Sequence, residues 1–279
     1  MLFLLLAIFS SSLVSIVMRL SEEKAKHNFG LLVMNYCMCA VLSAGSVGIS
    51  GIAAVEEPGW VKTTLMGCFN GVLYLSAFVL LNINIRKNGV VLSSTFMKLG
   101  LLVTMLISVL VYGERPGALQ WLGFVLAVAA IILINYRKEA AGSGFRAGLL
   151  LLLLCGGMAE AMSKIFEASG VPGMEGQFLF FTFLTALILC VGCMVVNGQR
   201  IGKAEVLYGL LIGIPNFVSS KFLLLALEDI PAVIAYPLSS VGSILVVTLA
   251  GVLVFRERLV KSQWLALGMI LAALVLLNM

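Results

Sequence analysis

The sequence predicts an all-α integral membrane protein with ten transmembrane helices, arranged as two inverted five-helix repeats. Three observations lead to this prediction. Hydrophobic residues make up 61% of the chain and charged residues only 11%, whereas a soluble domain carries about 25% charged residues. Apolar stretches alternate with short polar breaks along the whole chain, and a segment near the middle recurs near the end.

The apolar stretches are long enough to cross a bilayer, which takes about 20 predominantly apolar residues per helix. The first stretch lacks the basic start and the small-residue cleavage site of a signal peptide and runs directly to Arg19, so we expect it to be a membrane span. The ten predicted spans are residues 1–18, 30–52, 62–84, 89–112, 118–135, 147–168, 177–196, 204–227, 231–255 and 262–279.

The recurring segment covers residues 110–135 and 253–278. Matched positions lie 143 residues apart (257 − 114 = 143), and the two 26-residue windows are identical at 11 positions. Apolar composition alone would give about three matches, and it would not match charged residues such as Glu114 with Glu257. We therefore predict a duplicated membrane unit, with residues 1–139 as the first repeat and 145–279 as the second.

The basic residues indicate the topology. The odd-numbered connections hold thirteen Lys and Arg, and the even-numbered ones hold three. The positive-inside rule then places the odd connections in the cytoplasm and both termini outside. Because each repeat contains an odd number of spans, the second repeat must enter the membrane from the opposite side. Such inverted repeats are common in secondary transporters, which bind substrate near the bilayer midplane at the repeat interface.

Each half ends with the same motif. Glu114-Arg115 and Glu257-Arg258 are each followed, after a short gap, by Gln-Trp and a final apolar helix. With ten spans in two halves, the chain resembles the EamA family of the drug/metabolite transporter superfamily over nearly its whole length. The resemblance implies an inverted ten-helix bundle that exports or imports small metabolites by alternating access. We expect it to be integral to the plasma (cytoplasmic, or inner) membrane.

The resemblance also implies that Glu114 and Glu257 are structural, because the helix pair at each junction lies at the periphery in that family. The alternative is a role in catalysis or coupling. Each glutamate follows a helix end, where a carboxylate can pair with the neighbouring Arg or cap the next helix. The chain departs from many relatives at its start. They begin with a basic tail and are drawn with both termini inside, whereas this chain starts directly in its first span.

Ionisable residues inside predicted spans are the main candidates for a transport site, because each costs about 2.5 kcal/mol or more at the centre of a membrane helix. Glu160 and Lys164 are spaced i, i+4 in the favourable order for an intrahelical pair. They form either a self-neutralised pair or a site where Glu160 accepts a proton or a substrate ammonium group and Lys164 helps to release it. Lys164 also has a third reading, as a side chain that reaches the interface.

Lys98 and Lys221 have no charged counterpart in the other repeat, where their matches are Val241 and Phe78. An asymmetric pair added to a symmetric scaffold favours ligand contact, and the alternatives are snorkelling or hydrogen bonds to carbonyls of broken helices. Pro215 and Pro237 are expected to kink spans 8 and 9. The predicted substrate-binding residues, which include neighbours of both prolines, are Lys98, Glu160, Lys164, Asn216, Lys221 and Tyr236.

Other motifs predict packing rather than chemistry. The six cysteines lie in apolar runs, and Cys190-x-x-Cys193 has no His or carboxylate nearby in sequence, so we expect no metal. The Gly67-x-x-x-Gly71 and Gly209-x-x-x-Gly213 pairs predict close helix contacts. No sequence motif predicts a cofactor, a catalytic residue, an enzyme activity or nucleotide binding.

The sequence as a whole predicts a secondary transporter of a small polar metabolite. Three cations against one carboxylate in the spans favour an anionic or zwitterionic cargo such as an amino acid or an organic acid. The alternatives are an exporter of lipophilic cations and a flippase for a lipid-linked intermediate. The expected partners are the substrate, membrane lipid, and a proton or counter-substrate as the driving species, without nucleic acid.

Overall fold

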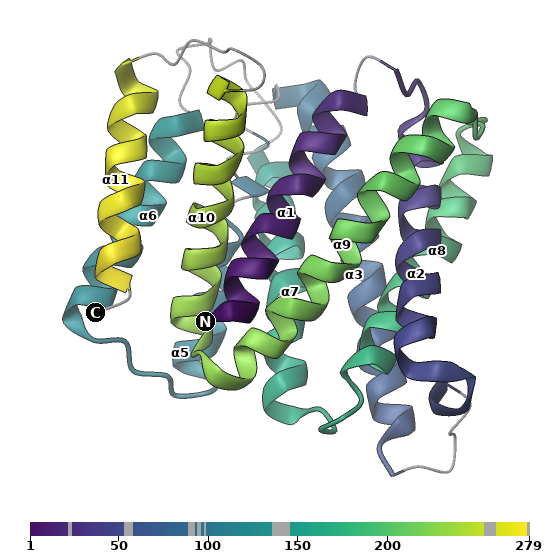
Figure 1. Cartoon of the computed structure of the whole chain (residues 1–279), viewed down its shortest axis with the longest axis horizontal. Coiled ribbons are helices and arrows are strands. Elements are labelled where there is room, and N and C mark those ends of the chain that lie inside the picture. The colour runs from purple at the N-terminus through teal and green to yellow at the C-terminus, as the bar shows by residue number, and fades with distance from the viewer. Residues whose placement is uncertain are drawn as a thin grey trace. The chain divides into compact units, whose positions relative to one another are not determined.

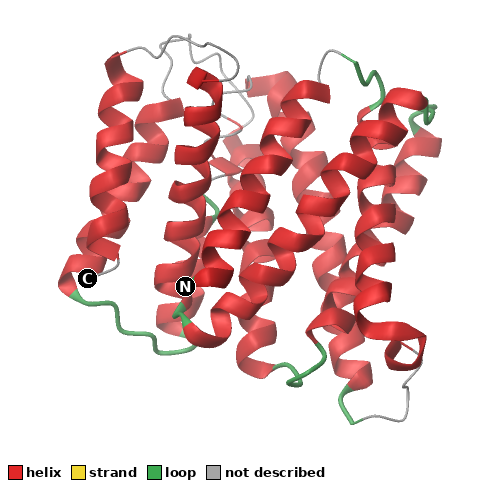
Figure 2. Cartoon of the chain, in the orientation of Figure 1, coloured by secondary structure: helices red, strands yellow, loops and turns green. Residues whose placement is uncertain are grey.

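The structure is a computed structural model, and it describes residues 1–21, 24–52, 58–88, 93, 96, 97, 99–135, 146–253 and 261–277. Within these ranges the chain forms ten α-helices and no strand (Figure 1, Figure 2). Seven of them are long and apolar enough to cross a membrane, and three are shorter apolar helices. The helices are α1 (Leu2–Ser21), α2 (Asn28–Ile52), α3 (Trp60–Asn88), α5 (Leu101–Leu110), α6 (Ala118–Asn135), α7 (Arg146–Ser169), α8 (Glu175–Val196), α9 (Lys203–Asp229), α10 (Ala232–Leu253) and α11 (Lys261–Leu277).

The prediction of an all-α membrane protein is confirmed, and most predicted spans match a helix to within a few residues. The fourth differs, because the helix described there is only Leu101–Leu110, and much of the predicted stretch before it, including Lys98, lies outside the described residues. The second span is interrupted at Gly48, whose φ of 76° and ψ of 158° are non-helical. Glycine tolerates this positive φ because it has no Cβ.

By contact the chain divides into two compact units. Unit 1 comprises residues 1–75 and 165–228, and unit 2 comprises residues 76–164 and 229–279. Each unit therefore takes helices from both halves of the sequence.

Small residues set the helix contacts of unit 1, and the predicted role of the glycine pairs is confirmed. A Cβ atom on Gly67 or Gly71 of α3 would lie 2.7 or 2.5 Å from a carbonyl oxygen of α8. One on Gly209 or Gly213 of α9 would lie 2.6 or 2.8 Å from a carbonyl oxygen of α2. Only glycine lets the two helix backbones approach this closely. In a lipid bilayer the hydrophobic effect does not drive helices together, so they associate through such close packing at small residues.

Helices α2 and α8 pack antiparallel in unit 1. Near one end of the pair, Cys190 Sγ lies 3.7 Å from the carbonyl oxygen of Phe29. Near the other end, a Cβ on Gly176 would lie 2.5 Å from a methyl carbon of Val47. The order of these contacts along the two helices fixes their opposite direction.

A buried carboxylate joins the start of α9 to the start of α2. Glu205, which is 4% exposed, accepts hydrogen bonds through Oε1 from the backbone N–H groups of Lys26 and His27 at 2.8 and 3.1 Å. Its Oε2 accepts from the N–H of Gly202 at 3.0 Å. The first N–H groups of a helix lack intrahelical acceptors, so this one side chain satisfies donors around two helix starts.

Unit 2 has its core between α6, α10 and α11. Its fully buried members are Ala127 and Ala130 of α6, Val241 of α10, and Ile270 and Ala273 of α11. Helices α6 and α11 run antiparallel, since the start of α6 lies against the last turn of α11. The alanines let the three backbones approach closely.

Helix α5 packs on α7 in the same unit. Thr104 Oγ1 donates to the carbonyl oxygen of Gly157 at 3.2 Å, and a Cβ on Gly157 would lie 2.4 Å from the carbonyl oxygen of Gly100. This contact holds α7, which carries two of the predicted site residues, against α5.

Large apolar side chains also lie on the outside of the helices. Leu110, Val196 and Leu253 are 77%, 86% and 76% exposed. In water such surfaces would drive aggregation, but a bilayer solvates them as well as a protein core does. The exposed surface therefore fits lipid contact.

Candidate functional site

The strongest candidate site lies in unit 2 and is organised around Glu114, on the connection between α5 and α6. Its Oε1 accepts a hydrogen bond from the N–H of Ala232 at 3.1 Å, and its Oε2 accepts one from the N–H of Val233 at 2.9 Å. These are the first two residues of α10. Helix N-termini have unsatisfied donors and a partial positive charge, so the carboxylate sits where α10 attracts an anion.

Lys164 of α7 supplies a full positive charge to the same carboxylate. Its Nζ lies 3.0 Å from Glu114 Oε1, and the two side chains are 10% and 13% exposed. The ammonium group also lies 5.6 Å from the ring centroid of Tyr112, within range of a cation–π contact. A buried pair of this kind is strongly destabilised when one partner is removed, because the other remains as an uncompensated charge.

A second contact joins α7 to α10 one turn away. Tyr236 is 3% exposed, and its hydroxyl donates to the backbone carbonyl oxygen of Glu160 at 2.6 Å. Glu160 precedes Lys164 by one turn of α7, and Tyr236 follows Ala232 by one turn of α10. Pro237 comes next, inside a continuous helix. The first turn of α10 is thus fastened to α7 on the N-terminal side of a proline.

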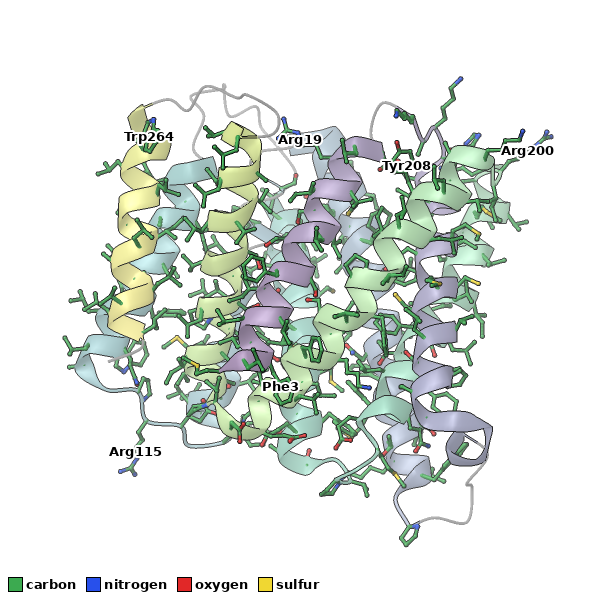
Figure 3. All side chains as sticks on the ribbon, in the orientation of Figure 1. Phe3, Arg19, Arg115, Arg200, Tyr208 and Trp264 are labelled. Atoms are coloured by element: carbon green, nitrogen blue, oxygen red, sulfur yellow. The ribbon has the colours of Figure 1, made fainter. Side chains whose placement is uncertain are left out.

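Three of the six predicted site residues therefore come together in unit 2: Glu160, Lys164 and Tyr236. The predicted i, i+4 pairing of Glu160 with Lys164 stays a prediction, and the ion pair described for Lys164 is with Glu114. The expectation that Glu114 caps the helix after it needs correction, because the helix it caps is α10. Arg115, its neighbour, is exposed and extends away from the ribbon (Figure 3).

Sequence reasoning missed Glu114 and Tyr112 as members of the site. Their partners lie 50 or more residues away, at Lys164 and Ala232, and no local pattern connects these segments. One available signal was topological. In the predicted ten-span topology, the connection after α5, the end of α7 and the start of α10 all border even-numbered connections, which would place them at one membrane face.

Two further predicted residues, Asn216 and Lys221, lie in unit 1. The side-chain amide of Asn216 donates to Asn35 Oδ1 at 3.1 Å, and Asn35 is 3% exposed. Lys221 is half-buried, with its Nζ 5.9 Å from the ring centroid of Phe217 on the preceding turn. The sixth predicted residue, Lys98, lies outside the described residues. Asn35 is a polar partner that the sequence reasoning did not single out.

Unit 1 also contains a cavity of about 200 Å³ at the α7–α8 connection and the end of α9. Its walls combine the aromatic and aliphatic side chains of Phe166, Val171 and Leu224 with carboxylates. This combination suits an organic cation, because apolar walls take up its body and acidic groups its charge. The three carboxylates that line the cavity belong to Glu167, Glu175 and Glu228.

Within the described residues, no three His, Cys, Asp or Glu side chains come together in a way that could hold a metal ion. Cys190 and Cys193 are free thiols.

The sequence matches a known protein family along both of its halves. The sequence model of the EamA-like transporter family matches residues 1–136 and again residues 147–279. An uncharacterized protein of Haemophilus influenzae is 23% identical over 281 residues, covering 97% of this chain and 95% of that protein. An uncharacterized inner membrane transporter of Escherichia coli K12, YedA, is 23% identical over 173 residues, which cover 60% of this chain and 55% of YedA.

The fold is shared with a solved protein. One crystal structure superimposes with a TM-score of 0.77 at 15% identity, covering 99% of this chain and 94% of the other. At this identity the likeness concerns the fold alone. With both halves of the sequence matched by the same transporter family and long apolar helices throughout the described residues, the chain belongs to the EamA-like transporter family, a family of multi-pass membrane transporters.

Proposed function

We propose that the protein is a secondary transporter of a small polar metabolite, anionic or zwitterionic, such as an amino acid or an organic acid. The observation that carries the proposal is the ion pair of Lys164 and Glu114, buried at the end of a membrane helix. Ionisable groups inside membrane segments are rare and mark substrate or ion pathways. Family membership supports transport in general.

Alternating access between two inverted repeats is part of the proposal. The 143-residue repeat makes three helix pairs equivalent: α2 with α8, α5 with α10, and α6 with α11. The members of each pair pack on one another, and contacts near their ends support antiparallel directions. Antiparallel pairs of this kind are what an inverted repeat predicts, and rocking of one repeat against the other would then expose a site to each side of the membrane in turn.

Within the proposed cargo class, the contacts favour a zwitterion. Glu114 already neutralises Lys164, and Glu160 adds another carboxylate on the same helix. Lys221 and Lys98, the other two lysines predicted to bind substrate, supply further positive charge. An amino acid, which carries both charges, matches a set of acidic and basic groups better than a simple anion does.

The remaining parts of the proposal concern the membrane and the driving force. The protein is integral to the cytoplasmic membrane, with both termini outside, as the excess of Lys and Arg in the odd connections supports. A gradient of protons or of a counter-substrate drives transport. The partners are then the small-molecule cargo, this coupling species and lipid.

Export of lipophilic cations is a second candidate, favoured by the cavity of unit 1. Three carboxylates and the ring of Phe166 line it, which suits an aromatic or alkyl cation. Under this alternative tetraphenylphosphonium would raise the melting temperature of the purified protein, and Glu228→Gln would reduce the effect.

The deciding experiment is thermal unfolding of the purified protein with amino acids, organic acids, sugar phosphates and organic cations. A cargo at 100 times its Kd should stabilise the protein by about 2.7 kcal/mol. We expect an amino acid or organic acid to act on the parent, with the effect lost in Lys164→Gln and reduced in Lys221→Gln or Lys98→Gln.

The matched control is Lys203→Gln, which removes an exposed lysine at the start of α9. It should respond to the cargo like the parent. Stabilisation by organic cations alone would contradict the proposal and favour the second candidate.

A further inference from the structure

The N-terminus of α10 and Lys164 form a carboxylate-binding site that is already occupied by Glu114. One carboxylate, that of Glu114, receives two backbone N–H groups and one ammonium group at 2.9 to 3.1 Å. The three donors come from α10 and α7, and the ring of Tyr112 lies beside the ammonium group. Together they match both oxygens of a planar carboxylate.

We propose that this is the site at which the cargo's carboxylate group binds, and that Glu114 is an internal competitor that occupies it in the absence of cargo. The proposal rests on the proposed transport of an amino acid or organic acid. Cargo binding exchanges one carboxylate for another. Lys164 and the two N–H groups keep an anionic partner before and after the exchange, so no buried charge is left uncompensated.

The local backbone allows Glu114 to leave without unfolding a helix. It lies on the non-helical connection between α5 and α6, between Gly113 and Gly117. Gly113 has a φ of 68°, and a Cβ on either glycine would meet nothing within 4 Å. The carboxylate can therefore move out while α5, α7 and α10 keep their positions.

The sequence repeat does not reproduce the cation of this site. In the repeat Glu114 corresponds to Glu257, but Lys164 corresponds to Ser21 (164 − 143 = 21). The second glutamate thus has no lysine at the matching position. Because Lys164 is not part of the repeated scaffold, a ligand that needs a cation explains its presence better than the shared fold does. Binding of the cargo's carboxylate is the role that fits Lys164.

Chemical rescue with acetate tests the proposal. The variant Glu114→Ala empties the site, and the purified protein is unfolded thermally in increasing sodium acetate, with sodium chloride at equal ionic strength as the reference. We expect acetate to restore much of the lost melting temperature and chloride to restore little. The acetate concentration for half the effect should be about tenfold lower than in the parent, where Glu114 competes.

The double variant Glu114→Ala/Lys164→Met is the matched control, and it should lose the rescue because the cation is gone. Sodium sulfate, tested in parallel, distinguishes a carboxylate site from a general anion site. If Glu114→Ala does not fold, Glu114→Gln serves instead, because the neutral amide keeps an acceptor for α10 but competes weakly for Lys164. Acetate effects no larger than those of chloride in the variant that folds would overturn the proposal.

Metabolite stabilisation of the parent and acetate rescue of the variants test the proposed function and the carboxylate site independently. If amino acids stabilise the parent but acetate rescues neither variant, transport stands and the site is wrong. If acetate rescues Glu114→Ala but no metabolite stabilises the parent, the carboxylate site stands and the proposed cargo class is wrong.

Discussion

Glu205 in unit 1 and Glu114 in unit 2 both accept backbone N–H groups near helix starts, but they differ in their other partners. Each is a shielded carboxylate beside a helix start, and each accepts backbone N–H groups. Glu205 has three such donors, and within the described residues it has no ion pair. Glu114 has two donors and the ammonium group of Lys164.

The difference separates a structural carboxylate from an exchangeable one. The donors of Glu205 belong to the chain segments that it joins, so removing it releases the start of α2 from the start of α9. The partners of Glu114 lie on α7 and α10, which Tyr236 and Glu160 also join. A buried cation is required only at the second site, and it creates a place for another anion.

The largest expected effect is that of Lys164→Met, which leaves the Glu114 carboxylate without its cation. Breaking a buried pair on one side costs about 3–5 kcal/mol. Adding Glu114→Gln should recover part of this loss, because the uncompensated charge is then removed. Unfolding in mixed detergent–SDS micelles measures both, and a single-variant loss below about 1 kcal/mol would show that the pair is not effectively buried.

Replacement of Glu205 should have a smaller effect. Glu205→Gln removes a charge whose partners among the described residues are backbone N–H groups, and it turns one acceptor into a donor, so we expect a loss of about 1.5–3 kcal/mol. The same unfolding assay applies. Acetate should not rescue this variant, because within the described residues Glu205 has no cation partner that would attract another carboxylate; rescue equal to that of Glu114→Gln would abolish the distinction between the two carboxylates.

The close helix contacts of unit 1 give the next effect. A Cβ on Gly213 would lie 2.5 Å from Met38 Cβ, so Gly213→Ala should cost about 1–3 kcal/mol through overpacking. Gly192→Ala on α8 is the control, because a Cβ there meets nothing within 4 Å. It should be neutral or stabilise by about 0.5–1 kcal/mol. Equal losses in both variants would contradict the assigned packing.

The smallest expected effect concerns the second link of unit 2. Tyr236→Phe removes only the hydroxyl that donates to the Glu160 carbonyl, and one such hydrogen bond contributes about 0.5–1.5 kcal/mol. Its melting temperature should fall slightly while acetate rescue in a Glu114→Ala background is retained. Loss of the rescue would mean that Tyr236 positions the site and does not merely fasten α10.

Local sequence patterns predicted the helices and some of their contacts. The apolar runs gave ten spans because their lengths match the bilayer. The glycine pairs predicted close helix contacts, because the lack of a side chain has the same consequence in any packed helix, but the partners α8 and α2 came only from the structure. Even so, Gly48 breaks α2 inside a predicted span, since a run of apolar residues does not record a backbone angle.

The sequence by itself determined that this is a helical membrane protein of a transporter family, because hydropathy and a repeated motif are properties of neighbouring residues. It also marked Glu160, Lys164 and Tyr236, since polar groups in apolar spans stand out. Only the tertiary structure decided what Glu114 does. Its partners are 50 and 118 residues away, and electrostatic contact depends on distance in space, which folding sets and the order of residues does not.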